Sequence, residues 1–442
     1  MASTYLTRTP SSTGNRKKWT WSGWIKKTKI GGSNNKELMS ANNGSNQFSS
    51  IFFNPADQLN YYDYTTGYSS QIITNRLFRD TAAWSHIVIA YDSAQSTSSD
   101  RIKLYVNGVQ ETSFGTSTYP SQNYDSFMNL SSVPNYIGRE TGTSNLYEGS
   151  MTHIHFCDSY AYDASSFGES DSTSGIWKPK TAPSVTYGTN GFFLKFENSG
   201  AMGTDSSGNG NNFTVNGTLT QNVDTPSNNF ATMNPLTKGV SASAYPTFAN
   251  GNTTITNTVR QHGFSSLGVS SGKWYTEFKI TSGATSSVTG ISDGSYTTYL
   301  GHGTGDYSYR GSDGTWYNNQ SATSYGSALS DNDIVGVALD LDNNKLYFSI
   351  NGTFQNSGDP TSGATGTGAI SISAPATGFY HFATGNILTS GTITAQSNFG
   401  QGYFGTTAVA SANADDGGLG AMEYDVPANY RILCTKNIKD YG

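Results

Sequence analysis

The chain of 442 residues contains 13% charged and 13% aromatic residues, 50 glycines and a formal net charge of −6. This length allows two or more domains that each bury a core, and low charge with many glycines is typical of loop-rich β proteins. The chain has no basic tail and no apolar run of membrane-spanning length, so we expect neither nucleic acid nor membrane insertion.

Short segments rich in aromatic and β-branched residues, separated by polar turns, follow one another through the first half. We predict strands at WTWSGWI, QFSSIFF, QLNYYDY, IITNRLF, NYIGR, residues 148–160 and residues 192–196. This spacing is typical of a β-sandwich, not of alternating strands and helices. Lys26 and Lys27 end the first of these strands and are interpreted as part of a solvated edge that resists edge-to-edge pairing.

One hairpin plan occurs twice in the chain. Residues 85–92 and 101–108 form the first copy, and residues 331–355 form the second. In both copies apolar residues alternate with polar ones, the return strand contains the triplet Lys-Leu-Tyr, and it ends in Asn-Gly. The repeat predicts two domains of related, antiparallel β architecture.

A composition shift separates these two domains. The segment DTPSNNFATMNPL at 224–236 has two prolines and no strand alternation. We therefore place the boundary near Asn228, which gives domains at 1–228 and 229–442. Further strands are predicted in the second domain at 273–280, 378–382 and 430–434, so the fold class is all-β with two antiparallel sandwiches.

Each predicted domain has one cysteine in a strand-like context. Cys157 and Cys434 are interpreted as buried free thiols, and a disulfide between the domains is the alternative. The first residues, MASTYLTRTPSS, lack the apolar core of a signal peptide. An extracellular type of composition without that signal fits a virus particle, which leaves its host by lysis.

Several motifs resemble known families. The second half is similar to a SPRY domain through SGKWYTEFKI, DIVGVALDLDNNKLYFSINGTF and NFGQ, in that order. The first half resembles a laminin-G-like jelly roll of the concanavalin A type through KKWTWSGWIK, WSHIVIAYD, RIKLYVNG and YIGR. The combination of these motifs with five further segments resembles structural proteins of tailed bacteriophages, particularly marine ones. The five segments are FGESDSTSGIWKPK, YGTNGFFLKFENS, DSSGNGNNF, DTPSNNFATMNP and YRILCTKNI.

The resemblance implies a virion protein with two sandwich domains, but it implies no activity. We expect a non-catalytic tail-fibre or receptor-binding component, without a cofactor, that is made in the host cytoplasm and assembles as a homo-oligomer. Its expected partners are other virion proteins and a glycan or receptor on the host surface. A head fibre or capsid decoration protein is the alternative, and a polysaccharide depolymerase is the third hypothesis.

Glycoside hydrolysis requires two carboxylates on either side of the scissile bond. Asp340 and Asp342 lie two apart on a strand, as do the acidic residues at 331/333 and 423/425. They abut turns, where aspartate is expected for conformational reasons, and the Glu-x-Asp-x-Glu strand of the related glucanases is absent. We therefore predict no catalytic residues.

Two segments contain metal-ligand types. His153, His155 and Cys157 share one face of a strand, so they are candidate transition-metal ligands. The alternative is a strand that buries Ile154 and Phe156 while its imidazoles are hydrogen-bonded or solvated, and this alternative is favoured. The loop at 205–213 is rich in oxygen ligands but lacks the calcium-loop pattern, so a tight turn is favoured there as well.

Aromatic clusters are the candidates for ligand binding, because exposed tyrosine and tryptophan rings suit sugar and surface recognition. One cluster is Tyr61, Tyr62 and Tyr64. The second lies where the SPRY resemblance places ligand loops: Tyr296, Tyr299, Tyr307, Tyr309, Trp316 and Tyr317. The alternative is that half of these rings belong to the core, since Tyr-Ser-Tyr at 307–309 also fits an ordinary strand.

Overall fold

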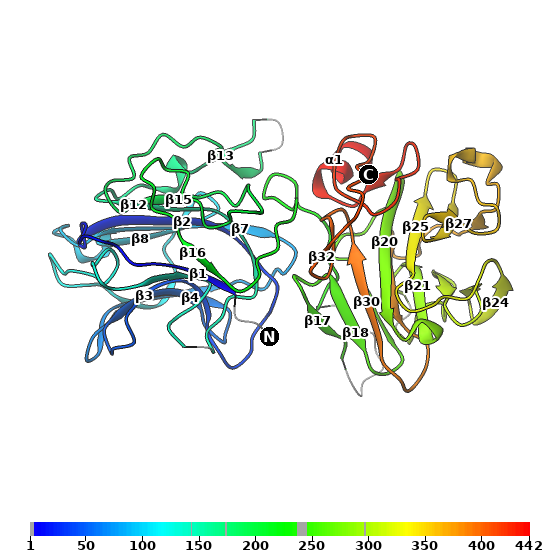
Figure 1. The fold of residues 1–442 in the computed structure, drawn as a ribbon, viewed down its shortest axis with the longest axis horizontal. Coiled ribbons are helices and arrows are strands. Elements are labelled where there is room, and N and C mark those ends of the chain that lie inside the picture. The colour runs from blue at the N-terminus through cyan, green and yellow to red at the C-terminus, as the bar shows by residue number, and fades with distance from the viewer. Residues whose placement is uncertain (1–3, 143, 173–174, 237–244, 296–297) are drawn as a thin grey trace. The chain divides into compact units, whose positions relative to one another are not determined.

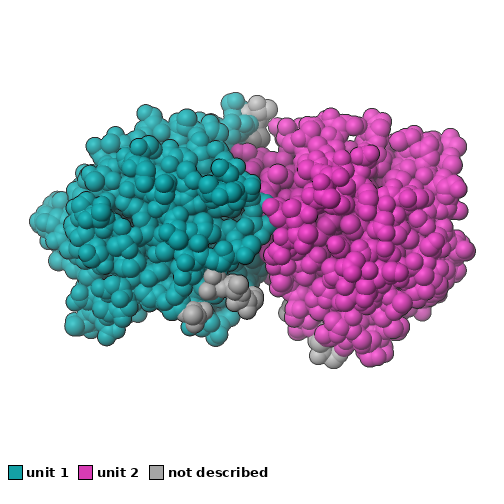
Figure 2. Space-filling view, viewed as in Figure 1, with its two compact units in different colours: residues 1–221 teal, residues 222–442 magenta. Residues whose placement is uncertain are grey.

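The computed structural model describes residues 4–142, 144–172, 175–236, 245–295 and 298–442. The chain divides into two compact units, residues 1–221 and 222–442 (Figure 2). Residues 222–228, which the sequence analysis assigned to the first domain, are part of the second unit. There, Asp224 accepts a hydrogen bond from the Phe230 N–H, and Thr225 bridges Asn228 in a tight turn.

Two large antiparallel sheets form the sandwich of the first unit (Figure 1). Sheet A has the order β10 (Phe114–Thr118), β6 (Tyr68–Leu77), β5 (Gln58–Tyr64), β4 (Phe48–Phe53), β3 (Lys36–Asn42), β11 (Asn135–Ile137), β1 (Tyr5–Arg8), β16 (Thr214–Asn216). Sheet B has the order β15 (Phe192–Leu194), β12 (Gly149–Asp158), β2 (Lys18–Lys27), β7 (Trp84–Asp92), β8 (Ile102–Val106), β9 (Val109–Glu111). The first predicted hairpin is confirmed as β7 and β8.

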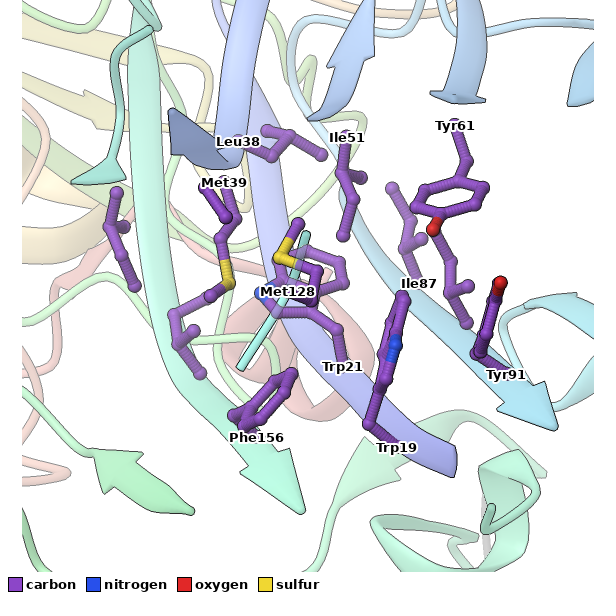
Figure 3. Close-up of a cluster of buried hydrophobic side chains, with 14 of the residues drawn as sticks. Trp19, Trp21, Leu38, Met39, Ile51, Tyr61, Ile87, Tyr91, Met128 and Phe156 are labelled. Atoms are coloured by element: carbon purple, nitrogen blue, oxygen red, sulfur yellow. The ribbon is translucent and has the colours of Figure 1, made fainter. Parts of the chain in front are cut away.

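The core of this unit lies between sheets A and B. Trp19 and Trp21, two residues apart on β2, point into it, and the ring of Trp19 stacks on Tyr91 with centroids 4.9 Å apart (Figure 3). The opposite face of sheet B is also buried, because residues 159–172 and 175–187, with β13 (Gly168–Ser170) and β14 (Trp177–Pro179), cover it.

The interpretation of Lys26 and Lys27 as a solvated strand edge is wrong. Their strand, β2, pairs with β12 on one side and β7 on the other, so it is central in sheet B. Both lysines are buried, and Lys27 forms an ion pair with Asp57.

The second unit is also a sandwich of two sheets. Sheet C has the order β17 (Thr247–Ala249), β18 (Thr254–Asn257), β30 (Ile393–Asn398), β20 (Lys273–Ser282), β25 (Ile334–Asp340), β26 (Lys345–Ile350), β27 (Thr353–Phe354), with β28 (Ile370–Ser371) beside β26 and β33 (Arg431–Ile432) beside β20. Sheet D has the order β19 (Gln261–Phe264), β29 (His381–Asn386), β21 (Ser287–Ser292), β22 (Asp306–Arg310), β23 (Thr315–Asn318), β24 (Ser321–Ser324). The second predicted hairpin is confirmed as β25 and β26.

The C-terminal part of the chain covers the outer face of sheet C. It includes β31 (Tyr403–Phe404), β32 (Thr407–Ala408) and the short helix α1 (Thr435–Tyr441). Single turns of 3₁₀ helix occur at Ser98–Asp100, Ala164–Ser166 and Ala284–Ser286, with a longer one at Pro360–Thr365. Both units are thus β-sandwiches, as predicted, and Cys157 and Cys434 are buried and free.

Within the described ranges, no helix has the length and apolar character required to cross a bilayer.

Candidate functional site

The five described residues of the second predicted aromatic cluster divide between the two faces of sheet D. Tyr307 and Tyr309 are 4% and 0% exposed, in the core between sheets C and D. Trp316 pairs with Tyr309 across the strands and packs, half-buried, against the same core. A ring enclosed by protein offers no face to a sugar, so Tyr307 and Tyr309 have a packing role in place of the predicted binding role.

Tyr299 and Tyr317 lie together on the outer face of sheet D. Their rings are stacked with centroids 6.3 Å apart, and the guanidinium of Arg260 lies 4.7 Å from the Tyr299 ring centroid. Burial raises the pKa of Tyr299 to about 12. Of the described residues in this cluster, only Tyr317 and Trp316 are partly exposed and remain candidates; Tyr296 lies outside the described residues.

The histidines of β12 are held by neighbouring side chains. A β-bulge interrupts the register between Thr152 and His155, and His153 within it has a φ of 48°. Ile154 and Phe156 face the core, as the favoured alternative predicted. His155 is stacked on Phe193 with centroids 3.9 Å apart, and burial holds its pKa well below the usual value.

These histidines belong to no metal-binding cluster. Among the described residues, no group of three or more histidine, cysteine, aspartate or glutamate side chains is placed to hold a metal ion. The loop at 205–213 is built on Asp205, whose carboxylate accepts hydrogen bonds from the N–H groups of Phe193, Ser207 and Asn211. These bonds organise a tight turn.

A buried serine and histidine lie side by side in the first unit. Ser22 Oγ is 2.9 Å from His86 Nε2, and the indole N–H of Trp177 donates to His86 Nδ1 at 3.0 Å. Since Nδ1 accepts and burial lowers the pKa of His86 to about 3, the proton of the neutral ring is on Nε2. The imidazole therefore donates to Ser22 and is in the wrong tautomer to act as its base.

The acidic pair of the second hairpin also has structural partners. Asp340 is completely buried and forms an ion pair with Lys273 at 2.9 Å. Asp342 accepts a hydrogen bond from the Gly272 N–H at 2.9 Å. Both carboxylates thus fasten the end of this hairpin to the neighbouring strand.

The other predicted aromatic cluster contributes to a solvent-facing patch on sheet A. Along β5 the side chains alternate: Tyr61 enters the core, whereas Tyr62 and Tyr64 are on the opposite face. Phe48 and Phe52 of β4 and Tyr68 of β6 join them there. We call this set (Phe48, Phe52, Tyr62, Tyr64 and Tyr68) the aromatic face.

Edge-to-face contacts hold the rings of the aromatic face in place. Tyr62 contacts Phe48, Phe52 and Tyr68 with centroid distances of 5.4, 5.1 and 5.5 Å. Tyr64 contacts Tyr68 at 5.3 Å. Tyr68 is 52% exposed, and Phe48, Tyr62 and Tyr64 are partly exposed. Rings fixed in this way present apolar surface at little further cost in conformational entropy.

Two carboxyl groups lie beside the aromatic face. Burial, followed by the charges of Glu37 and Glu140, raises the pKa of Tyr62, so its phenol stays protonated. Burial also raises the pKa of Glu37 well above its usual value, and Ser50 donates a hydrogen bond to it. Glu140 accepts hydrogen bonds from the side-chain amides of Asn42 and Asn145. Of these two carboxyl groups only Glu140 is partly exposed, so it alone adds an accessible hydrogen-bond acceptor beside the rings.

Comparison with protein families gives two matches. Residues 2–162 match the concanavalin A-like lectin/glucanases superfamily, and residues 273–374 match the SPRY domain. The aromatic face lies within the first match, and Trp316 and Tyr317 lie within the second. No curated protein matches the chain.

Solved structures with similar parts include the SPRY domain of human HERC1, with 17% identity, a TM-score of 0.28, and coverage of 34% of this chain and 91% of that chain. The PSpry domain of TRIM65 has 15% identity and a TM-score of 0.29, covering 38% and 91%. A heptameric SAP-like pentraxin from Limulus polyphemus has 13% identity and a TM-score of 0.28, covering 36% and 72%. TM-scores this low carry no argument about function.

Proposed function

We propose that this chain, which carries a concanavalin A-like domain followed by a SPRY domain, is a non-catalytic adhesion protein that binds a glycan or receptor on a host cell. Both domain types suggest binding. The aromatic face is the observation that carries the proposal, because it is a cluster of rings on the outside of a sheet, where packing of the core does not require them. Exposed patches of this kind mark interaction sites.

The proposed setting is the virion of a tailed bacteriophage, where the chain would serve as a tail fibre or receptor-binding component. The combined motifs from FGESDSTSGIWKPK to YRILCTKNI support this setting by their resemblance to phage structural proteins. In this setting the chain is a homo-oligomer and its other partners are virion proteins.

A capsid decoration protein is the second candidate, supported by the same resemblance. It would bind purified heads that lack tails, and loss of the aromatic face would leave that binding unchanged. The burial of a carboxyl group beside the aromatic face argues against a depolymerase. Glu37, the carboxyl group beside the aromatic face with the strongly raised pKa, is 1% exposed, so a substrate bond has no access to it.

The experiment combines three readouts on the purified chain. Adhesion predicts binding to host cells that is lost in a Tyr64→Ala/Tyr68→Ala variant and kept in Tyr160→Ala, an exposed tyrosine outside the aromatic face. Binding to tailless heads without binding to cells would favour decoration. Release of reducing sugar from host polysaccharide would overturn the non-catalytic proposal. Antibody labelling of intact particles would then show whether the chain is on the tail or the head.

A further inference from the structure

A pocket of about 220 Å³ opens at one end of the first sandwich. It lies between the two sheets: Phe53 and Arg76 come from sheet A, while Trp84 and Val106 come from sheet B. Phe78 and Trp84, each 9% exposed, give it aromatic walls, whereas Phe53, 1% exposed, belongs to the core behind them. We call it the end pocket.

Two arginines line the pocket, and their side chains are half exposed. Arg76 is 51% exposed and Arg79 is 55% exposed. The Nε of Arg76 bonds to Glu111 at 2.7 Å, and the Nε of Arg79 bonds to Asp57 at 3.2 Å. Within the described residues, the terminal nitrogens of both guanidinium groups have no hydrogen-bond partner, so each keeps donors for a ligand.

The two exposed guanidinium groups of the end pocket are each paired with a buried carboxylate. The side chains of Asp57 and Glu111 are only 2% and 8% exposed. Asp57 also pairs with the buried ammonium of Lys27, so one carboxylate serves two cations. The three cations Lys27, Arg76 and Arg79 are thus balanced by the three carboxylates of Asp57, Glu111 and Asp80, so the unpaired guanidinium N–H groups, and not a net positive charge, are what the pocket offers to an anion. Asp80 lines the pocket too, and its Oδ1 accepts from the N–H groups of Ala82 and Ala83.

We propose that the end pocket binds the carboxylate of an acidic sugar of the hexuronic acid class. A guanidinium presents parallel N–H donors that match a carboxylate, and aromatic walls suit the apolar face of a sugar ring. The volume is below the range of about 300–1,000 Å³ typical of drug-sized ligands, which fits a single ring. Asn107, whose side-chain nitrogen has no partner within the described residues, adds a donor for a ring hydroxyl.

The end pocket is separate from the aromatic face, because no residue of the aromatic face lines it. Binding at one site can therefore fail while binding at the other persists. The chain would accordingly recognise an acidic sugar unit independently of its contact with a longer glycan.

The test titrates the full chain with glucuronate, glucose and acetate, using saturation-transfer nuclear magnetic resonance or calorimetry. Glucose lacks the carboxylate and acetate lacks the ring, so both should bind at least roughly tenfold more weakly than glucuronate. Arg76→Gln/Arg79→Gln should weaken glucuronate binding by a similar factor. Lys103→Gln, at an ion-paired lysine that does not line the pocket, removes one positive charge and should leave binding unchanged.

Two further variants test the proposal independently of the arginine variant, in case that variant does not fold. Leu77→Glu places a carboxylate at an exposed position of the pocket lining and should abolish glucuronate binding, whereas Asp80→Asn removes a negative charge and should strengthen it. Circular dichroism checks that each variant is folded. Equal affinity for glucuronate and glucose, or unchanged binding in folded Arg76→Gln/Arg79→Gln and Leu77→Glu, would overturn the proposal.

Discussion

The ring of Tyr68 meets the ring of Tyr62 edge to face, with their centroids 5.5 Å apart. These residues come from neighbouring strands, and Tyr68 is the most exposed member of the aromatic face. The contact orients Tyr62 without enclosing either ring in the core. It therefore explains how the first unit displays aromatic surface in a fixed arrangement.

Replacing Tyr68 with alanine should cost little stability. The substitution removes two edge-to-face contacts, to Tyr62 and Tyr64, but leaves no buried cavity. Aromatic pairs contribute about 0.5–1.5 kcal/mol each, less where solvent reaches them. We expect the free energy of unfolding of Tyr68→Ala to fall by roughly 1–2 kcal/mol in a urea titration. A loss above about 3 kcal/mol would mean that Tyr68 acts as a core residue.

Two buried tyrosine hydroxyls should respond in opposite ways to replacement by phenylalanine. The hydroxyl of Tyr61 donates to Asp63 at 2.8 Å, whereas the buried hydroxyl of Tyr91 has no hydrogen-bond partner within the described residues. Tyr61→Phe leaves a buried carboxyl group without one donor and should cost about 1–3 kcal/mol. Tyr91→Phe should be neutral or stabilising. Thermal unfolding of both variants checks this, and an equal loss in both would contradict the hydrogen-bond assignment.

The free energy of unfolding should depend on pH through Glu277. Its two carboxyl oxygens accept hydrogen bonds from the N–H groups of Glu423 and Tyr424, and burial raises its pKa from 4.5 to about 7. Because the folded chain holds this proton more tightly than the unfolded chain, the contribution is complete below pH 4.5 and is lost as the pH rises through 7. The difference between the pKa of Glu277 in the folded chain and its ordinary value corresponds to roughly 3 kcal/mol in the free energy of unfolding.

Denaturant titrations between pH 5 and pH 8 compare the wild type with Glu277→Gln. The variant loses one hydrogen-bond acceptor and should be less stable than the wild type at pH 5. Between pH 5 and pH 8, the free energy of unfolding of the wild type should decrease by about 2–3 kcal/mol more than that of the variant. Burial also raises the pKa of Asp306, to about 6, and this group is common to both proteins. Parallel pH profiles would contradict the assignment to Glu277.

The two thiols should be unreactive in the folded chain. Cys157 and Cys434 are both 0% exposed, and burial raises the pKa of each thiol. Reactivity requires an accessible thiolate. Ellman's reagent should therefore detect no thiol under native conditions and two per chain in guanidinium chloride. Fewer than two after unfolding would indicate a disulfide.

Local patterns in the sequence were sufficient to predict both hairpins and most of the long strands. In β25 and β26 the alternation of apolar residues and the turn between them are set within one short segment. Strand β3 (Lys36–Asn42) was not predicted, because its residues KELMSAN are buried throughout and show no alternation. The central position of β2, which buries Lys26 and Lys27, depends on pairing with distant strands.

The candidate sites were harder to predict, because alternation shows which residues share a face but not which face is exposed. Tyr307 and Tyr309 share a face as expected, and that face is the core side of sheet D. For the aromatic face, the sequence indicated Tyr62 and Tyr64, but Phe48 and Tyr68 join them only through strand pairing. The end pocket had no local signal, since its residues come from four separate stretches of the chain.

The most direct test of the account measures binding of the full chain to host cells as a function of concentration. The wild type is compared with Tyr68→Ala, with Tyr64→Ala/Tyr68→Ala and with the control Tyr160→Ala. We predict that loss of Tyr68 weakens binding by roughly threefold to tenfold, as expected for one aromatic contact, that loss of both tyrosines weakens it further, and that the control binds like the wild type. Equal binding by folded wild-type and doubly substituted chains would contradict adhesion through the aromatic face.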